Sequence, residues 1–303
     1  TGMDEHGQKI EEVAAKAKMD PQAFTDKIAL GTKTIWKDLN ISYDYFIRTT
    51  DKNHVEAVQM IFEKLLANGD IYLGSYTGNY CVSCETFFTK TQLGEGDTCP
   101  DCGKPTKMVA EESYFLNLKK YEEKVLQFIE SHPNFIQPAT RRNEVISFIQ
   151  SGLEDLCVSR TSFTWGVKVP SNPKHVVYVW IDALSNYITA LGYDQKNDEL
   201  YQKYWVNNDK IYQVVGKDIL RFHAIYWPIL LMALDIPVNY SLYVHGWILN
   251  RDGKMSKSRG GVVYPMDLVN VYGVDAVRYY LTKELPLGND GLFSYERFIE
   301  RYN

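Results

Sequence analysis

The chain has no apolar run long enough to cross a membrane. A spanning helix needs about 18 consecutive apolar residues, and polar or charged residues interrupt every hydrophobic stretch of this sequence before that length. The first residues also lack the basic-then-apolar pattern of a secretory signal peptide. We therefore expect a cytoplasmic protein with no membrane partner.

An excess of positive charge is also missing. Against 33 Lys and Arg there are 38 Asp and Glu residues, which gives a formal net charge of −5. Any RNA partner must therefore bind a local basic surface, because the overall field does not favour a polyanion. The 303 residues suffice for two or three structural units. No repeat or low-complexity tract is present, and nothing predicts a stable protein partner.

Cysteine is scarce, and its spacing is informative. Four of the five cysteines form two C-x-x-C pairs, Cys81/Cys84 and Cys99/Cys102, with fourteen residues between the pairs. In a reducing compartment such pairs hold metal more often than they form disulfides. The segment they enclose has too few apolar residues for a core, so we predict one structural Zn²⁺ bound by all four thiolates. Cys157 stands alone and is predicted to be a small buried apolar residue.

Hydrophobic patterning predicts an α/β protein. We expect helices over residues 54–67, 118–131 and 143–153, and strands over 71–80, 176–180, 211–215 and 242–245. The strands over 176–180 and 211–215 are each followed by a helical pattern, the second over 219–234, which is typical of a buried parallel sheet with crossover helices. Residues 1–7 show neither the helical nor the strand period of apolar residues. The pattern predicts a nucleotide-binding domain interrupted by an inserted metal-knuckle domain.

A short basic loop carries the strongest local signal. Lys254-Met255-Ser256-Lys257-Ser258 is flanked by Asp252-Gly253 and Arg259-Gly260-Gly261. Small residues let such a loop approach a polyphosphate, and two ammonium groups can neutralise the charge that grows on leaving pyrophosphate. A solvated basic loop would have a similar composition. The pentapeptide is, however, identical to the second signature of class I aminoacyl-tRNA synthetases.

The segment Gly216-Lys217-Asp218 ends a predicted strand and opens a helix. Gly216 would let a flat base come close, Asp218 could accept hydrogen bonds from ribose hydroxyls, and the helix start favours a phosphate. The alternative is a helix cap with an acidic residue in the first turn.

Two sets of residues at helical spacing combine aliphatic side chains with rings that carry a polar atom. Such stripes usually belong to a core, but these rings need hydrogen-bond partners when buried, and a thioether packs well against aromatic edges. They therefore also fit a methionine-sized pocket. The sets are Trp180, Ala183, Leu184 and Tyr187 on one helix, and Ile219, His223 and Trp227 on the other.

Four strings together resemble the methionyl-tRNA synthetase family of class I synthetases, in order, over nearly the whole chain. They are Gly2-Met3-Asp4-Glu5-His6-Gly7, the segment from Tyr178 to Tyr187, the segment from Gly216 to Pro228, and the segment from His245 to Ser258. The resemblance implies a Rossmann-like nucleotide-binding parallel sheet interrupted by a zinc-knuckle connective-peptide insertion.

The resemblance also implies a role for each site residue. Asp4 would bind the methionine ammonium, and Arg160 would orient that aspartate. Lys254 and Lys257 would be catalytic. The methionine side chain would contact Trp180, Ala183, Leu184, Tyr187, Ile219, His223 and Trp227, and ATP would contact Gly216, Asp218, His245, Lys254 and Lys257, with Mg²⁺ bound to the nucleotide.

The family pattern implies a division of the chain and one departure from it. The first signature, His-x-Gly-His, does not occur in the sequence and is expected upstream of Thr1. The expected parts are the catalytic domain over 1–71 and 175–250, the connective-peptide insertion over 72–174, the basic loop and stem-contact region over 251–294, and the start of a helical anticodon-binding domain over 295–303.

The implied reaction is activation of methionine by ATP and transfer to tRNA(Met). The closest alternative is a sister synthetase for leucine, isoleucine or valine, but the stretch between Tyr72 and Lys174 is too short for the editing insertion of those enzymes. A zinc-knuckle RNA-binding protein without the chemistry is the alternative from another class.

Overall fold

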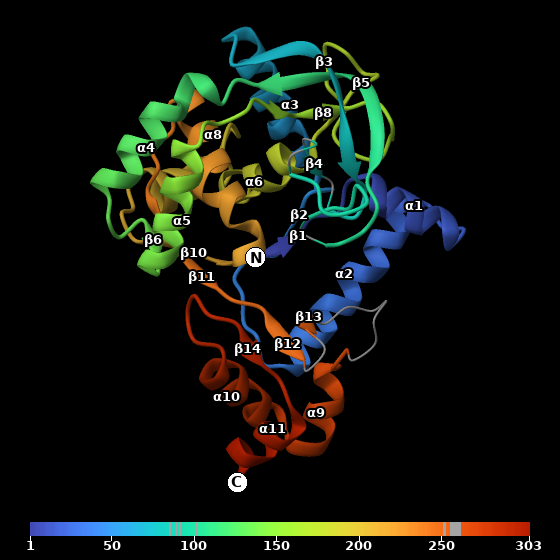
Figure 1. The fold of residues 1–303 in the computed structure, drawn as a ribbon, viewed down its shortest axis with the longest axis vertical. Coiled ribbons are helices and arrows are strands. Elements are labelled where there is room, and N and C mark those ends of the chain that lie inside the picture. The colour runs from blue at the N-terminus through green and yellow to red at the C-terminus, as the bar shows by residue number, and fades with distance from the viewer. Residues whose placement is uncertain (85, 89, 91, 101, 251–252, 255–261) are drawn as a thin grey trace.

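The computed structural model describes residues 1–84, 86–88, 90, 92–100, 102–250, 253–254 and 262–303. The chain forms a large α/β body with a smaller helical lobe below it (Figure 1). The N-terminus lies in the middle of the molecule, and the C-terminus lies at the far end of the lower lobe.

Short parallel strands form the centre of the large body. β10 (Ile211–Gly216) pairs with β11 (Tyr240–His245), and β11 pairs with β6 (Ile136–Gln137), all in parallel. The register places Gly216 opposite His245. A second parallel pair joins β1 (Gly2–Met3) to β2 (Ile47–Arg48). The strands predicted over 211–215 and 242–245 are confirmed, whereas residues 2–3 form a strand that their pattern did not predict.

The parallel strand predicted over 176–180 is wrong. Only β9 (Val176–Val177) is extended, and it pairs antiparallel with β8 (Ser159–Arg160). Helix α6 (Val179–Thr189) begins immediately afterwards. A short apolar run has no period that separates a buried strand from the buried first turn of a helix, and here the run contains both.

The insertion forms an antiparallel sheet at the top of the molecule (Figure 1). Its long strands β3 (Ile71–Cys81) and β5 (Lys107–Leu116) pair over ten residues of each strand, from Ile71 opposite Leu116 to Tyr80 opposite Lys107. β4 (Thr86–Phe88) and β7 (Leu156–Cys157) complete the order β4-β3-β5-β7. The strand predicted over 71–80 is therefore confirmed.

Helices cover the central strands and form one large apolar core with them. α3 (Lys52–Ala67) confirms the helix predicted over 54–67. The helix predicted over 118–131 opens with a 3₁₀ turn (Lys119–Tyr121) before α4 (Glu122–Ser131), and α5 (Ala139–Gln150) lies about one turn earlier than predicted. The remaining helices of this body are α1 (Gln8–Lys16), α2 (Pro21–Asp38), α7 (Glu199–Tyr201) and a π-helical turn (Gln202–Val206).

The predicted helix over 219–234 is three consecutive pieces. A 3₁₀ turn (Lys217–Ile219) leads to a π-helical turn (Phe222–Tyr226) and then to α8 (Trp227–Ala233). π-helical turns are frequent at functional sites. The wider turn changes the spacing of the side chains that face α6.

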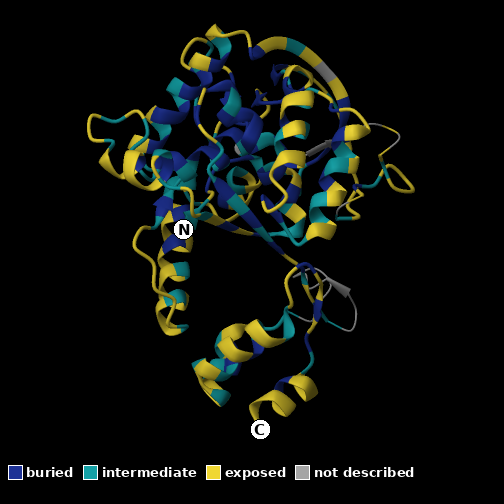
Figure 2. Ribbon diagram, turned by 90° about the vertical axis from the view of Figure 1, so that its left-hand side faces the viewer, coloured by how far each residue is buried: buried dark blue, intermediate teal, exposed yellow. Residues whose placement is uncertain are grey.

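The lower lobe has its own small core (Figure 2). α9 (Pro265–Tyr272), α10 (Val274–Glu284) and α11 (Tyr295–Tyr302) bury Leu268, Val277, Tyr280, Phe293 and Phe298 together. β12 (Ile248–Asn250) pairs with both β13 (Gly253–Lys254) and β14 (Gly291–Leu292), and it connects the lobe to the large body. No helix in the described part of the chain has the length and apolar character of a membrane span.

Candidate functional site

A cavity of about 840 Å³ opens between β1, α6 and β10. Asp4, Ala183 and Tyr187 line it, so two segments that are far apart in the sequence contribute predicted methionine-site residues to one space. Gln213 of β10 also lines this cavity. Its side chain is 5% exposed, and neither amide atom has a hydrogen-bond partner among the described residues.

The ring of His223 connects the two predicted stripes. Its Nε2 lies 2.7 Å from the Tyr187 hydroxyl, and its Nδ1 lies 2.9 Å from the carbonyl oxygen of Ile219. A carbonyl only accepts, so Nδ1 carries the proton and Nε2 accepts from Tyr187. Burial lowers the pKa of His223 to about 4, although the Ile219 carbonyl opposes this shift. Burial also raises the pKa of Tyr187 to about 12, so both groups are neutral near pH 7.

Aromatic rings of α6 lie against rings of the segment over residues 222–227. The ring centroids of Trp180 and Phe222 lie 3.6 Å apart in a stacked arrangement, and those of Tyr187 and Trp227 lie 6.0 Å apart. Trp227 is fully buried, and the predicted residue Leu184 is 1% exposed. Of the predicted stripe residues, Ala183 and Tyr187 line the cavity, whereas Trp180, Leu184, Ile219, His223 and Trp227 are not among its lining residues. The stripes are thus core and cavity wall at once.

Arg160 has a carboxylate partner that the sequence analysis did not identify. Its Nε donates to Glu111 Oε2 at 3.0 Å, and its guanidinium lies 3.9 Å from the ring centroid of Tyr80. Burial alone would raise the pKa of Glu111, but the Thr161 hydroxyl and Arg160 hold it below its ordinary value. The predicted orientation of Asp4 by Arg160 stays a prediction.

Three predicted ATP residues meet at the carboxyl ends of β10 and β11. A Cβ atom added to Gly216 would lie 2.5 Å from Asp218 Oδ1 and 3.6 Å from His245 Cε1. A side chain at position 216 would therefore fill the space that these two residues border. This edge of a parallel sheet is where α/β proteins commonly bind nucleotides.

The described residues include only part of the basic loop. Lys257 and the rest of residues 255–261 lie outside the described residues, as does the side chain of Lys254. The backbone of Lys254 pairs antiparallel with Leu249. The structure therefore describes the strand pair β12–β13 that leads into the loop. The predicted roles of Lys254 and Lys257 stay predictions.

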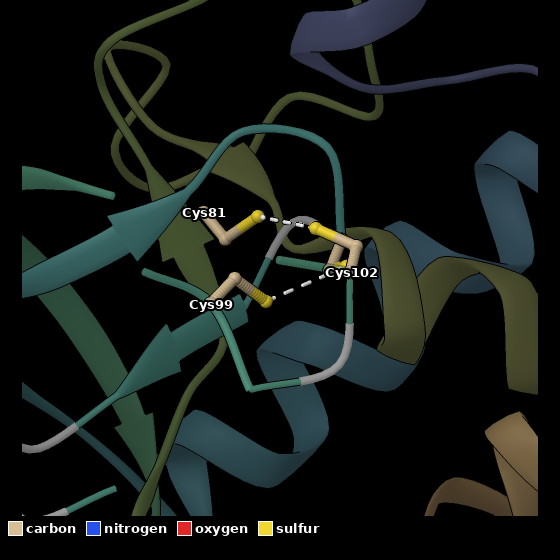
Figure 3. Close-up of side chains that lie close together, drawn as sticks. Cys81, Cys99 and Cys102 are labelled. Atoms are coloured by element: carbon tan, nitrogen blue, oxygen red, sulfur yellow. Dashed lines mark hydrogen bonds between the residues drawn. The ribbon is translucent and has the colours of Figure 1, made fainter. Parts of the chain in front are cut away.

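The four paired cysteines meet at one point, and Figure 3 shows Cys81, Cys99 and Cys102 of this cluster. The four sulfur atoms all lie within 4.8 Å of one another. Cys81 Sγ lies 3.5 Å from Cys102 Sγ, and Cys99 Sγ lies 3.8 Å from Cys84 Sγ. A tetrahedral ion with Zn–S bonds of about 2.3 Å needs sulfur atoms about 3.8 Å apart. The four residues therefore fit one zinc ion.

The environment of these thiols also favours a cation. Among the described residues of this segment, the buried apolar side chains of the cluster are just Cys81, Phe88 and Cys99. In the absence of a cation, burial and the neighbouring thiols raise the pKa of Cys84 well above its ordinary value. Four thiolates this close together would repel one another. A divalent cation offsets this repulsion because it binds the thiolate form of cysteine. Cys157 is buried elsewhere, and its Sγ contacts the Ser159 carbonyl at 3.3 Å.

A buried ionic cluster behind α6 was also absent from the sequence analysis. Asp182 has no exposed surface and accepts hydrogen bonds from His6 and His54. The sequence contained a weak signal for this cluster. His54 lies on the apolar face of α3 with Val58 and Ile61, where a histidine needs a buried partner.

The chain as a whole matches one protein family. The model described as tRNA synthetases class I (M) matches residues 1–303. The chain belongs to this family.

Relatives and solved structures agree with this assignment. The chain is 57% identical to the methionine–tRNA ligase of Clostridium perfringens (strain 13 / Type A) and 55% identical to that of Bacillus subtilis (strain 168). It is covered completely in both comparisons but spans 46% and 47% of these relatives. The chain thus spans about half the length of the curated relatives it matches.

The structural similarity extends to a ligand-bound relative. Mycobacterium tuberculosis methionyl-tRNA synthetase in complex with methionyl-adenylate superposes with a TM-score of 0.95 at 44% identity, over 100% of this chain and 60% of that chain. The free-state structure of that enzyme gives 0.80 at 42% identity, over 92% and 54%. These comparisons show that the chain has the class I synthetase fold. The predicted Rossmann-like fold with a cysteine-knuckle insertion is therefore confirmed.

Proposed function

We propose that the full-length protein is a cytoplasmic methionine–tRNA ligase and that this chain carries most of its methionine-activating site. The observation that carries the proposal is the cavity shared by Asp4, Ala183 and Tyr187. It combines a carboxylate, suited to an ammonium group, with an apolar and aromatic wall, suited to a thioether. The relatives with methionyl-adenylate support the same ligand.

In this proposal methionine's own carboxylate is the nucleophile. It attacks the α-phosphorus of ATP, releases pyrophosphate and forms methionyl-adenylate, from which the terminal ribose hydroxyl of tRNA(Met) takes the methionyl group. A carboxylate is already ionised at neutral pH, so no side chain has to act as nucleophile. The protein then contributes position and charge stabilisation.

The proposed roles of the residues are those that the family resemblance implies. Asp4 binds the methionine ammonium, and the Tyr187–His223 pair lies beside the side-chain pocket. Gly216, Asp218 and His245 bind the nucleotide, while Lys254 and Lys257 bind its phosphates together with Mg²⁺. One Zn²⁺ bound by the four paired cysteines would stabilise the fold of the knuckle. The divisions expected at residues 71, 174, 250 and 294 belong to this proposal too.

The neutral Tyr187–His223 pair also bears on the choice among amino acids. A leucine, isoleucine or valine site needs only apolar contacts, and a buried hydroxyl and imidazole beside it would bring no benefit. The thioether of methionine is polarizable and packs favourably against an aromatic ring such as that of Tyr187, which lines the cavity. The pair therefore supports methionine over the branched aliphatic amino acids.

Charging of tRNA by the full-length protein tests the proposal. We expect ATP-dependent attachment of methionine to tRNA(Met), and no comparable attachment of leucine, isoleucine or valine to their tRNAs. An RNA-binding protein that lacks the chemistry would bind tRNA but leave it uncharged. That result would overturn the proposal.

A further inference from the structure

A buried carboxylate connects helix α6 to two other parts of the chain. Asp182 Oδ2 lies 2.6 Å from His6 Nδ1, and Asp182 Oδ1 lies 2.7 Å from His54 Nε2. The other ring nitrogen of His54 lies 2.6 Å from the Thr189 hydroxyl. His54 on α3 therefore bridges two positions of α6 that are two turns apart.

The cluster lies on the back of the helix that forms the cavity wall. At 100° per residue, Asp182 and Thr189 lie within about 20° of each other on α6 and about 100–160° around the helix from Ala183 and Tyr187. All four cluster residues are buried: Asp182 fully, and His6, His54 and Thr189 to at least 92%. One side of α6 thus lines the cavity, while the side that carries Asp182 and Thr189 is held by hydrogen bonds with His6 and His54.

The second histidine belongs to the loop that carries Asp4. Glu5 in this loop accepts from Arg48 Nε at 2.8 Å, and its backbone oxygen accepts from Trp165 Nε1 at 2.6 Å. The neighbours of Asp4 are therefore fixed on the body of the protein. The contact between His6 and Asp182 then sets the separation between this loop and α6.

The hydrogen-bond partners define the protons. A carboxylate only accepts, so His6 Nδ1 and His54 Nε2 both donate to Asp182. The Nδ1 atom of His54 shares its hydrogen bond with the Thr189 hydroxyl. Burial alone would raise the pKa of the Asp182 carboxyl, but His6 and His54 hold it below its ordinary value. Asp182 is thus an anion with two dedicated donors.

We propose that Asp182 is a positioning residue for methionine binding, which holds Asp4 and Tyr187 at a fixed separation through its contacts with His6 and His54. The inference rests on the proposed function, because it assigns Asp4 and Tyr187 to the same amino acid. Asp182 itself lies behind the cavity wall and does not touch the substrate. Its loss should therefore weaken methionine binding more than ATP binding.

Methionine-dependent pyrophosphate exchange by the full-length enzyme tests this inference. Asp182→Asn keeps the size of the side chain but replaces one acceptor oxygen with a donor that faces a donating histidine. Loss of the fixed separation between Asp4 and Tyr187 should weaken their contacts with the amino acid in the ground state, so we expect the KM for methionine to rise about tenfold or more. The KM for ATP should stay within about twofold.

A matched pair at position 54 separates positioning from general destabilisation. The amide of His54→Gln can reach the place of Nε2 and donate to Asp182, whereas that of His54→Asn reaches only the place of Nδ1, beside Thr189. Both variants remove the imidazole. We expect His54→Gln to keep a KM for methionine near that of the unmodified enzyme, and His54→Asn to raise it as Asp182→Asn does.

Ser185→Ala is the control for a lost buried hydroxyl. Ser185 is 1% exposed, and its hydroxyl donates to Ile181 of the same helix at 2.7 Å. Its removal should leave the KM for methionine unchanged. If Asp182→Asn does not fold, the comparison of the two position 54 variants still decides.

The outcomes distinguish the inference from the proposed function. Equal KM values for methionine in the two position 54 variants would overturn the inference, and so would a parallel rise in the KM values for methionine and ATP. An unmodified enzyme without methionine-dependent exchange would overturn the proposed function as well.

Discussion

The Tyr187 hydroxyl donates to Nε2 of His223 across 2.7 Å and thereby fixes the tautomer of a buried imidazole. The Ile219 carbonyl accepts from the other ring nitrogen at 2.9 Å. Both nitrogens have partners in the neutral form, so a proton added to the ring would place a positive charge in a buried site and require the Tyr187 hydroxyl to turn from donor to acceptor. This arrangement makes the stability of the protein depend on pH.

The first prediction concerns His223. Its folded-state pKa of about 4 is below the ordinary value of 6.5, so the unfolded chain binds more protons between these values. The free energy of unfolding should therefore fall as pH falls through this window, by about 2 kcal/mol between pH 7 and pH 5. His223→Gln lacks this contribution. Urea unfolding at both pH values checks the prediction, which is wrong if the variant and the unmodified protein lose the same free energy.

The second prediction concerns the metal. Elemental analysis should find one zinc ion per chain, since the four sulfur atoms lie within 4.8 Å of one another. Cys84→Ser should lower the zinc content and destabilise the knuckle, because little apolar core remains there. Cys157→Ser is the matched control and should keep one ion. Zero or two ions per chain in the unmodified protein would contradict the predicted site.

The third prediction concerns the basic loop. Lys257→Ala in the full-length enzyme should lower the rate of adenylate formation by about 10²–10³-fold, the size expected for loss of one charge-stabilising donor. The KM for methionine should change little, since this lysine is predicted to contact phosphate. Lys196→Ala, at an exposed position outside the site, should leave both values unchanged. A raised KM for methionine with an intact rate would refute the assigned role.

The fourth prediction concerns the selectivity of the pocket. Homocysteine lacks the terminal methyl group of methionine, and an apolar pocket rejects such an analogue by only about 1–3 kcal/mol, or 10–200-fold. The enzyme should therefore activate homocysteine measurably. The ratio of kcat/KM values in pyrophosphate exchange gives the discrimination. A ratio above about 10⁴ would mean that the pocket recognises the methyl group by other means.

The sequence predicted the features that depend on spacing. Two C-x-x-C pairs indicated a common metal site, and their sulfur atoms meet in the structure. Helical spacing placed Tyr187 and His223 in two stripes that were assigned to one pocket, and in the structure their side chains share a hydrogen bond. The strands over 211–215 and 242–245 carried their own apolar pattern, so their parallel pairing was predictable.

Features that depend on long-range partners were not predictable. Nothing near Asp182 in the sequence indicates that its carboxylate lies between His6 and His54, because 176 and 128 residues separate it from these partners. The same holds for the contact of Arg160 with Glu111. The end of the strand at Val177 also depended on pairing with β8 and not on residue type.

Methionine-dependent exchange of pyrophosphate into ATP, measured on the full-length protein without tRNA, tests the central claim most directly. This step involves the amino acid and nucleotide residues that we assign to the chain, and it does not require the anticodon to be recognised. We predict exchange with methionine and at least about 10²-fold less with leucine, isoleucine or valine. No exchange, or exchange that favours a branched aliphatic amino acid, would contradict the assignment of the cavity between Asp4 and Tyr187 to methionine.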